Sequence, residues 1–202
     1  MRGPVGKRLF DIAVALGGLL VFGLPMIAIA LWIRLDSAGP VFFRQARVGR
    51  HGRLFRIHKF RTMVADAAAR GPAVTVGGDP RITRAGAWLR RSKLDELPQL
   101  LGVLAGDMSI VGPRPELPQY VALYPPALRE RVLSVRPGIT DPVSLRYADE
   151  GAMLARAADP EREYREVVLP AKLQEAAAYA ARATLWSDLG VIGRTLALLL
   201  RR

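Results

Sequence analysis

The longest apolar segment of the chain is residues 12–33, in which 22 consecutive positions carry no charged side chain. Asp11 and Arg34 bound it on its two sides. As a helix, this segment would be about 33 Å long, which is enough to cross a bilayer core of about 30 Å. The pattern therefore predicts a membrane helix near the start of the sequence.

Two features argue that this helix does not cross the membrane. Basic residues flank it on both sides, and since they prefer the cytoplasm, both ends are expected there. Pro25, close to Gly23, cannot donate the hydrogen bond that the Val21 carbonyl would accept, so the helix should kink. Split at Pro25, its arms would span roughly 20 Å and 12 Å, too short to cross. Two alternatives therefore fit residues 1–36 equally well: a re-entrant helix broken at Pro25 and a kinked helix that spans the membrane.

Residues 41–63 predict a short β-hairpin, because two strand-like runs flank the turn-like sequence GRHG at 49–52. Basic side chains recur along it, at positions 44, 47, 50, 53, 56, 59 and 61. Most of them are expected to form a face that is attracted to anionic lipid. Lys59 and Arg61 stand at the end of the second strand and are the candidates for a phosphate site.

The rest of the chain is mainly helical in pattern. An alanine-rich helix is expected after residue 62, then the loop GPAVTVGGDPRIT, and then a helix in RAGAWLRRS. The last fifty residues also have a helical pattern. Within residues 184–202 the apolar side chains share one side, so this helix lies either in the membrane interface or in the core. The fold class is therefore α+β, mainly helical, with a compact helical catalytic domain over residues 37–202.

Charge and composition limit the classes of binding partner and of metal site that the protein can have. The formal net charge of +12 and the pI near 11.1 imply an anionic partner, which is nucleic acid, a lipid surface or a phosphorylated small molecule. The absence of cysteine excludes disulfides and thiolate metal sites, and two histidines are too few for a zinc centre.

Two adjacent acids, Asp95 and Glu96, stand among basic residues in SKLDELPQL. An ordinary helix start is one explanation, because Asp caps helices. The cations just before the pair, and Arg114 between the two prolines of GPRP, point instead to bound phosphate. An ionised Asp95 can ligate Mg²⁺ or attack phosphorus, and Glu96 can hold the metal or take a proton. We expect Asp95 to be ionised at neutral pH because of the helix dipole and the arginines.

The order of several motifs resembles the bacterial sugar transferases, the small monotopic phosphoglycosyl transferases. The matching stretches are KRLFDIAVA, GPVFFRQARVGRHGRLFRIHKFRTM, DPRITRAGAWLRRSKLDELPQL, GDMSIVGPRPE and RPGIT, which cover nearly all of residues 7–140. The resemblance implies transfer of a sugar phosphate from a UDP-sugar to polyprenol (undecaprenyl) phosphate, with release of UMP. It places the enzyme at the cytoplasmic face of the bacterial inner membrane.

The resemblance also implies roles for single residues. Asp95 corresponds to the family's nucleophile, which forms a phosphosugar-enzyme intermediate in the presence of Mg²⁺, and Glu96 is its partner. Arg90 and Arg114 correspond to the arginines that hold phosphate. The family's re-entrant helix is broken at a proline that corresponds to Pro25.

This chain departs from the family pattern in some places. Leu24 stands where a serine is common, Lys93 replaces a small hydroxyl residue, and Gly102 replaces an asparagine. The tract DPVSLRYADEGAML after RPGIT also differs, which leaves the identity of the sugar open.

A second class of function fits the charge and the anchor: a basic, membrane-anchored module that binds anionic lipid or nucleic acid without catalysis. It leaves the acid pair unexplained, and the ordered aromatic residues of an RNA-binding sheet are not evident, so no nucleic acid partner is expected. The sequence leaves open whether the protein is a monomer or a homodimer.

Overall fold

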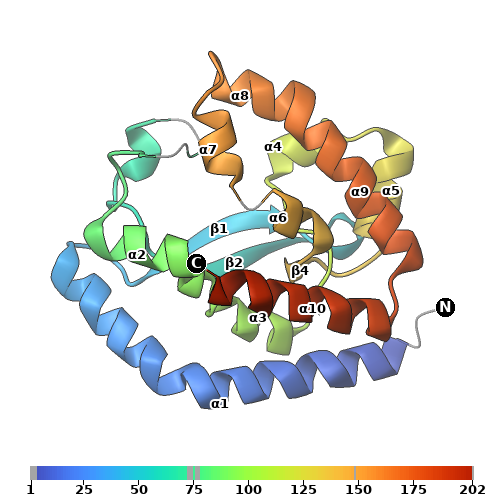
Figure 1. Ribbon diagram of the computed structural model, residues 1–202, viewed down its shortest axis with the longest axis horizontal. Coiled ribbons are helices and arrows are strands. Elements are labelled where there is room, and N and C mark those ends of the chain that lie inside the picture. Colours follow the sequence, from blue (N-terminus) through green and yellow to red (C-terminus); the bar gives the residue numbers. More distant parts are fainter. Residues whose placement is uncertain (1–3, 72–74, 76–77, 148, 202) are drawn as a thin grey trace.

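Two antiparallel strands lie at the centre of the molecule in the computed structural model, which describes residues 4–71, 75, 78–147 and 149–201 (Figure 1). β1 (Phe42–Val48) and β2 (Leu54–Phe60) pair in a register that places Phe42 opposite Phe60. His51 and Gly52, in the turn between them, have positive φ angles of 58° and 79°. The predicted hairpin is confirmed.

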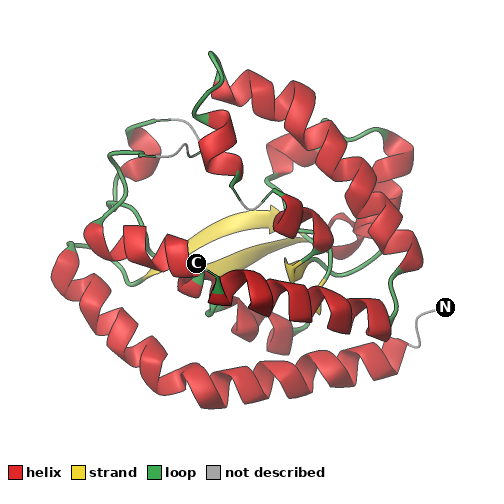
Figure 2. Ribbon diagram, in the orientation of Figure 1, coloured by secondary structure: helices red, strands yellow, loops and turns green. Residues whose placement is uncertain are grey.

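Helices surround this hairpin, and a second, parallel pair of short strands completes the fold (Figure 2). The short strands are β3 (Ser109–Val111) and β4 (Gly138–Thr140). The helices are α1 (Pro4–Asp36), α2 (Arg84–Ser92), α3 (Gln99–Ala105), α4 (Pro118–Val121), α5 (Pro126–Leu133), α6 (Pro142–Arg146), α7 (Glu150–Leu154), α8 (Pro160–Glu163), α9 (Leu169–Arg182) and α10 (Leu185–Leu200). A π-helical turn at Tyr164–Val168 joins α8 to α9. The expected mainly helical α+β composition is confirmed.

α1 runs without interruption from Pro4 to Asp36, with Pro25 inside it. Figure 1 shows it as one bent rod, so the expected break takes the form of a bend. Pro25 removes a single backbone donor, and the hydrogen bonds on either side maintain the helical path. By length and composition, α1 is the one helix among the described residues that can cross a membrane.

The N-terminal part of α1 is fixed to the domain by buried charges. The Nζ atom of Lys7 lies 3.0 Å from a carboxylate oxygen of Asp11 and 2.8 Å from one of Asp188 in α10. Asp11 Oδ1 also accepts hydrogen bonds from Ser109 Oγ at 3.0 Å and from the Ile110 amide at 3.1 Å. Both carboxylates are buried, so water screens these interactions little.

The C-terminal end of α1 is attached to the same domain. The Arg61 guanidinium donates hydrogen bonds to the carbonyl oxygens of Ser37 at 2.7 Å and Ile33 at 3.5 Å. Asp36 Oδ2 accepts a hydrogen bond of 3.0 Å from the Ala85 amide at the start of α2. Both ends of α1 are therefore held by one folded body.

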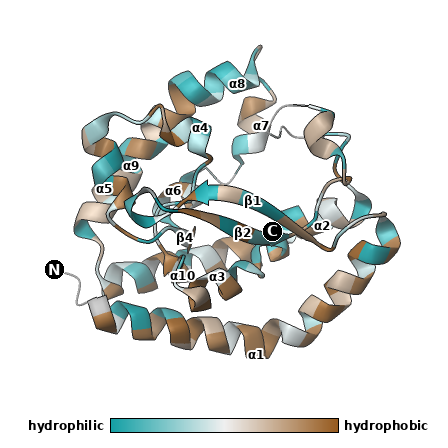
Figure 3. Ribbon diagram, turned by 180° about the vertical axis from the view of Figure 1, so that it is seen from behind, coloured by the Kyte–Doolittle hydropathy of each residue, from teal (hydrophilic) through white to brown (hydrophobic). Residues whose placement is uncertain are grey.

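Apolar side chains point outward along the whole of α1, and Figure 3 shows hydrophobic residues concentrated on this helix. The large exposed ones are Val5, Leu9, Val14, Leu16, Leu20, Val21, Phe22, Leu24, Ile27, Leu31, Trp32 and Leu35. α10 adds Trp186, Leu189, Leu196 and Leu200, while its Asp188 and Val191 are buried. α10 thus combines the two alternatives considered for it, since one side packs in the core and the other exposes apolar residues.

The expected alanine-rich helix is wrong. Only one 3-10 turn, Ala67–Ala69, forms there. The buried Arg81 side chain donates a hydrogen bond of 3.1 Å to the Ala67 carbonyl and pairs with Asp79 at 2.6 Å. These tertiary contacts override the helix propensity of alanine. Residues 72–74 and 76–77 of the predicted loop lie outside the described part of the chain.

Candidate active site

Asp95 and Glu96 lie in the sharp turn that connects α2 with α3. α2 ends at Lys93, whose left-handed backbone (φ 59°) redirects the chain. A 3-10 turn over Leu94–Glu96 follows, and α3 begins after Pro98 without a side-chain cap. The alternative that Asp95 caps this helix is therefore wrong, and the turn presents two buried carboxylates next to each other.

Glu96 is the centre of an ion-pair network. Arg114 donates to both of its oxygens, at 2.6 Å to Oε1 and 3.3 Å to Oε2. Lys59 Nζ, from β2, donates to Oε1 at 2.7 Å. Three of the residues predicted for the site thus meet, although 37 positions separate Lys59 from Glu96.

These contacts determine the charge state of the network. Burial alone would raise the pKa of Glu96, but the positive charges of Arg114 and Lys59 lower it well below the ordinary value. The charge of Glu96 in turn raises the pKa of Arg114. Burial lowers the pKa of Lys59, and Glu96 partly offsets that effect. Glu96 therefore stays ionised and holds both cations in place.

Asp95 is in a different state from its neighbour. Its Oδ1 atom is buried and accepts no hydrogen bond from the described residues. Burial raises the pKa of Asp95, and the positive charge of Lys59 opposes this only in part. The expectation of a lowered pKa is wrong in direction, because burial and the neighbouring charge of Glu96 outweigh the cations Lys59, Lys93 and Arg90. A buried carboxylate oxygen without a hydrogen-bond donor is typical of groups that react or that bind a cation.

Arg90 lies at the C-terminal end of α2, close enough for its charge to favour the ionised form of Asp95. Its Nε atom donates a hydrogen bond of 2.9 Å to Thr62 Oγ1. This bond fixes the side chain through one nitrogen, and none of the described residues accepts a hydrogen bond from the two terminal nitrogens, which could bind an anion. The position suits the phosphate-binding role expected for Arg90.

Arg61 lies outside the network, contrary to expectation. Its guanidinium is buried and donates to the carbonyl oxygens of Ile33, Ser37 and Ala38. Ser37 and Ala38 lie just beyond the end of α1, where backbone carbonyls attract a cation. The Ile33 carbonyl also accepts the Ser37 amide at 3.2 Å. Arg61 therefore holds the apolar helix α1 against the domain, and we no longer assign it to phosphate binding.

The two expected Mg²⁺ ligands differ in what they can offer. Asp95 has a buried oxygen without a hydrogen bond, which suits a hard cation. Glu96 Oε1 accepts two charge-assisted hydrogen bonds, which occupy its lone pairs, and Oε2 accepts one. Among the described residues, no three acidic, histidine or cysteine side chains come together in a way that could hold a metal ion. Of the two expected ligands, Asp95 is the one with a free oxygen, and Mg²⁺ can be held by one or two carboxylates together with substrate phosphates.

The loop that carries Arg114 is held on both sides. The Pro113 carbonyl accepts a hydrogen bond from the Gly138 amide at 3.0 Å, next to the pair formed by β3 and β4. On the other side, Arg47 of β1 donates to the Pro115 carbonyl at 3.2 Å. The backbone on both sides of Arg114 is therefore held by tertiary contacts as well as by the two prolines.

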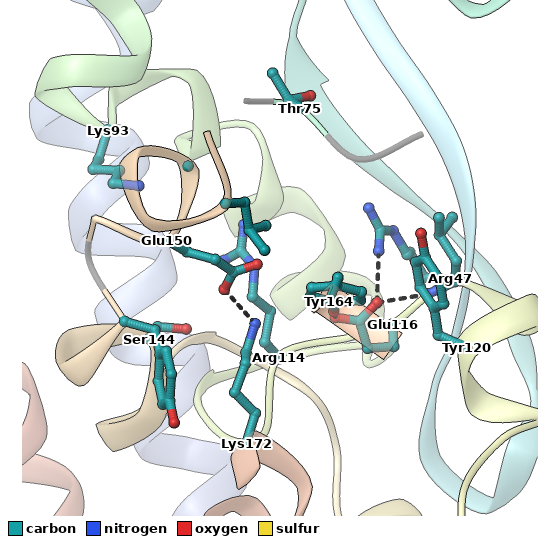
Figure 4. A pocket seen from close by; sticks show the side chains of 14 residues that line it. Arg47, Thr75, Lys93, Arg114, Glu116, Tyr120, Ser144, Glu150, Tyr164 and Lys172 are labelled. Atoms are coloured by element: carbon teal, nitrogen blue, oxygen red, sulfur yellow. Dashed lines mark hydrogen bonds and ion pairs between the residues drawn. The ribbon is translucent and has the colours of Figure 1, made fainter. Parts of the chain in front are cut away.

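A cavity of about 310 Å³ opens beside Arg114 (Figure 4). Lys93, next to the acid pair, lines it together with residues from β1, from the loop after GPRP and from helices α6, α7 and α9. They include Arg47, Glu116, Tyr120, Ser144, Tyr147, Glu150, Tyr164 and Lys172. Arg114 thus lines the cavity and also binds Glu96 of the acid pair.

Sequence reasoning missed most of this cavity. Glu116 directly follows GPRP, and this position was a usable signal. Glu150, Tyr164 and Lys172 lie in the divergent C-terminal region, where only the folded chain brings them beside Arg114. No motif in the sequence contains these three residues, so sequence reasoning assigned them no role.

The site also lies next to the long apolar helix α1. α2 and α3, which flank the acid pair, both contact α1. Gly18 of α1 faces Leu100 of α3 so closely that an added Cβ would lie 3.0 Å from Leu100 Cδ1. The turn with Asp95 and Glu96 therefore sits between two helices that rest directly on α1.

Several known proteins are similar to this chain in sequence. An exopolysaccharide production protein (PSS) of Rhizobium leguminosarum bv. phaseoli is 53% identical over 54% of this chain and 54% of its own length. The undecaprenyl-phosphate glucose phosphotransferase of Komagataeibacter xylinus is 47% identical over 66% of this chain and 26% of its own. The UDP-glucose:undecaprenyl-phosphate glucose-1-phosphate transferase of Xanthomonas campestris pv. campestris is 39% identical over 93% of this chain and 37% of its own.

The chain thus spans about half or less of the length of these three relatives. The family model for bacterial sugar transferases matches residues 3–202, which is nearly the whole sequence. With the acid pair, the GPRP arginine and the long apolar helix in place, this match shows that the chain belongs to the bacterial sugar transferase family.

Proposed function

We propose that the protein transfers a sugar phosphate from a UDP-sugar to a polyprenol phosphate, such as undecaprenyl phosphate, and releases UMP. The observation that carries the proposal is the contrast within the acid pair: Glu96 is bound by two cations, whereas buried Asp95 keeps an oxygen without a hydrogen bond. The names of the Komagataeibacter and Xanthomonas relatives include undecaprenyl phosphate, and the Xanthomonas name includes UDP-glucose.

In the first step, an oxygen of Asp95 forms a bond to the phosphorus that carries the sugar. The bond from this phosphorus to the bridging oxygen breaks, and UMP leaves with its electron pair. Asp95 then carries the phosphosugar as an acyl phosphate. Arg90 and Arg114 bind the phosphate oxygens, since the guanidinium of Arg114 has three N–H groups beyond the two that Glu96 uses.

In the second step, a phosphate oxygen of the polyprenol phosphate attacks the same phosphorus. The bond to Asp95 breaks, its carboxylate is restored, and the product is a polyprenol diphosphate sugar. Asp95 is the residue that would hold Mg²⁺, which would supply positive charge that lets anions approach each other. Glu96 orients Lys59 and Arg114 in both steps.

The proposal includes a re-entrant α1 at the cytoplasmic face of the bacterial inner membrane. The two ends of α1 are attached to the same domain through Lys7 and Arg61. A helix that crossed the bilayer would separate its ends by about 30 Å of hydrocarbon, which one domain on one face cannot bridge. The outward apolar residues of α1 and α10 then enter the bilayer, and the acid pair beside α1 meets the lipid phosphate near its surface.

The decisive experiment measures UMP release from a panel of UDP-sugars with Mg²⁺ and polyprenol phosphate. Asp95→Asn and Asp95→Ala should abolish release, while Asp66→Asn, an exposed acid outside the site, should behave as wild type. A trapped turnover mixture should yield a peptide that carries the phosphosugar on Asp95. Near-normal turnover of Asp95→Asn would refute covalent catalysis, and no UMP from any donor would favour a non-catalytic membrane-bound module.

A further inference from the structure

An ion pair from the divergent region lines the cavity next to Arg114. Glu150 of α7 and Lys172 of α9 lie with Oε2 and Nζ 2.6 Å apart. Their side chains are 26% and 13% exposed. Figure 4 shows both side chains directed toward Arg114 from their own helices. The pair is therefore accessible to a ligand whose phosphate binds Arg114.

The orientation of this pair is fixed by its surroundings. Lys172 Nζ lies 5.4 Å from the centre of the Tyr164 ring, a cation–π contact that restrains the ammonium group. Among the described residues, none donates a hydrogen bond to Glu150 Oε1. The pair thus keeps one carboxylate acceptor and two ammonium donors for a ligand, already held in place.

The charges divide the cavity into two ends. Lys93 and Arg114 line the end next to the acid pair, where they suit phosphates. Elsewhere, each carboxylate has its own cation, because Lys172 binds Glu150 and Arg47 lies 3.5 Å from Glu116. The cavity wall that these two ion pairs form is therefore neutral overall. It is rich in hydrogen-bond donors and acceptors, which a sugar ring with hydroxyl groups requires.

The chemistry of the donor indicates which part of it lies at this wall. The sugar is bonded directly to the phosphorus that the nucleophile attacks, whereas a further phosphate separates the uridine from it. Groups immediately beside Arg114 are thus within reach of the sugar. We infer that Glu150 and Lys172 bind hydroxyl groups of the donor's uncharged hexose and determine which sugar is accepted. This inference rests on the proposed function.

The test measures the affinity of purified full-length protein in detergent for UDP-glucose, UDP-galactose, their N-acetylamino counterparts and UDP-glucuronate. Glu150→Gln and Lys172→Met keep the size of each side chain, and Met retains the packing over Tyr164. Each variant should bind the preferred UDP-sugar about 10- to 100-fold more weakly than the wild type, because a charge-assisted hydrogen bond is lost. The ratio between the affinities for the glucose and galactose epimers should also fall. The affinity for UMP should stay as in wild type, which also verifies folding.

Glu175→Gln is the matched control. Glu175 also lies on α9 and pairs at 2.7 Å with Arg146, but this pair is exposed and lies outside the cavity lining. It should leave the affinity for every UDP-sugar unchanged.

Three outcomes would overturn the inference. The first is an unchanged ranking of the UDP-sugars in both cavity variants, and the second is a preference of the wild type for UDP-glucuronate. The third is a loss of UMP affinity as large as the loss of UDP-sugar affinity, which would place the nucleotide at the pair. Failure of the proposed function looks different. In that case the wild type would bind UDP-sugars with a ranking that Glu150 and Lys172 control, yet release no UMP.

Discussion

Arg114 binds Glu96 through both terminal nitrogens, at 2.6 and 3.3 Å, and so leaves the neighbouring aspartate without that cation. The two carboxylates share one turn but have opposite pKa shifts, downward for Glu96 and upward for Asp95. Such a division is typical of sites in which one acid positions other groups and the second one reacts. It leads to the following predictions.

Replacing Arg114 by Lys should reduce kcat/KM for UMP release by about 10- to 100-fold, although the charge is kept. Lysine cannot donate to both oxygens of Glu96 and to a phosphate in one fixed plane, so at least one charge-assisted hydrogen bond is lost. Steady-state kinetics at several concentrations of the donor measures the effect. Arg131→Lys, an exposed position on α5, is the control. Unchanged kinetics for Arg114→Lys would remove this residue from the site.

Replacing Glu96 by Gln should lower the free energy of unfolding at pH 7 by about 2–4 kcal/mol, because Lys59 and Arg114 lose their buried counter-charge. The measurement is denaturant unfolding in detergent with EDTA, so that no metal contributes. The pKa of Glu96 is lower in the folded than in the unfolded protein, where it is about 4.3. Its stabilising effect is therefore complete above that value and is lost progressively as the pH falls toward the folded pKa.

The difference between wild type and Glu96→Gln should accordingly narrow from pH 6 to pH 3. A difference that is constant over this range would show that the loss comes from packing rather than from charge. Glu175→Gln, whose partner Arg146 is 71% exposed, should show little change at either pH.

Replacing Gly86 by Ala should destabilise the protein by about 3 kcal/mol or more, or prevent folding. A Cβ at this position would lie 2.0 Å from the Thr62 carbonyl oxygen, and backbone on both sides leaves no room to relax. Thermal unfolding in detergent measures the loss. Gly190→Ala, in α10 with nothing within 4 Å of the added Cβ, should instead be neutral or stabilising by about 0.5–1 kcal/mol. Equal effects of the two changes would mean that α2 does not pack this closely against Thr62.

Single cysteines at the two ends of α1 should report its topology, since the natural sequence contains no cysteine. Val5→Cys and Pro40→Cys should both react with a membrane-impermeant maleimide in inside-out vesicles and resist it in right-side-out vesicles. The reason is that Lys7 and Arg61 attach both ends to one domain. Both variants must retain UMP release for the labelling to count. Labelling of the two positions from opposite sides would establish a spanning helix.

Local patterns were sufficient for several elements. The hairpin around residues 49–52 and the helix at 84–92 follow from strand runs, a glycine-flanked turn and a helical run, all of which act within a few residues. The long apolar helix follows from composition alone, and the motifs around Asp95 and Arg114 led to the family. Only a short turn formed in the alanine-rich stretch, because the Arg81 side chain binds the backbone of that turn.

The sequence by itself determined where the apolar helix and the hairpin lie and which residue types surround the acid pair, because these depend on neighbours in the chain. Only the tertiary structure decided that Arg61 binds the end of α1, that Glu96 rather than Asp95 receives Lys59 and Arg114, and that Glu150 and Lys172 face the same cavity. Cations and carboxylates of similar chemistry are interchangeable in a sequence pattern. Folding selects among them, because a buried charge is stable only beside the partner that the packed backbone brings within hydrogen-bonding distance.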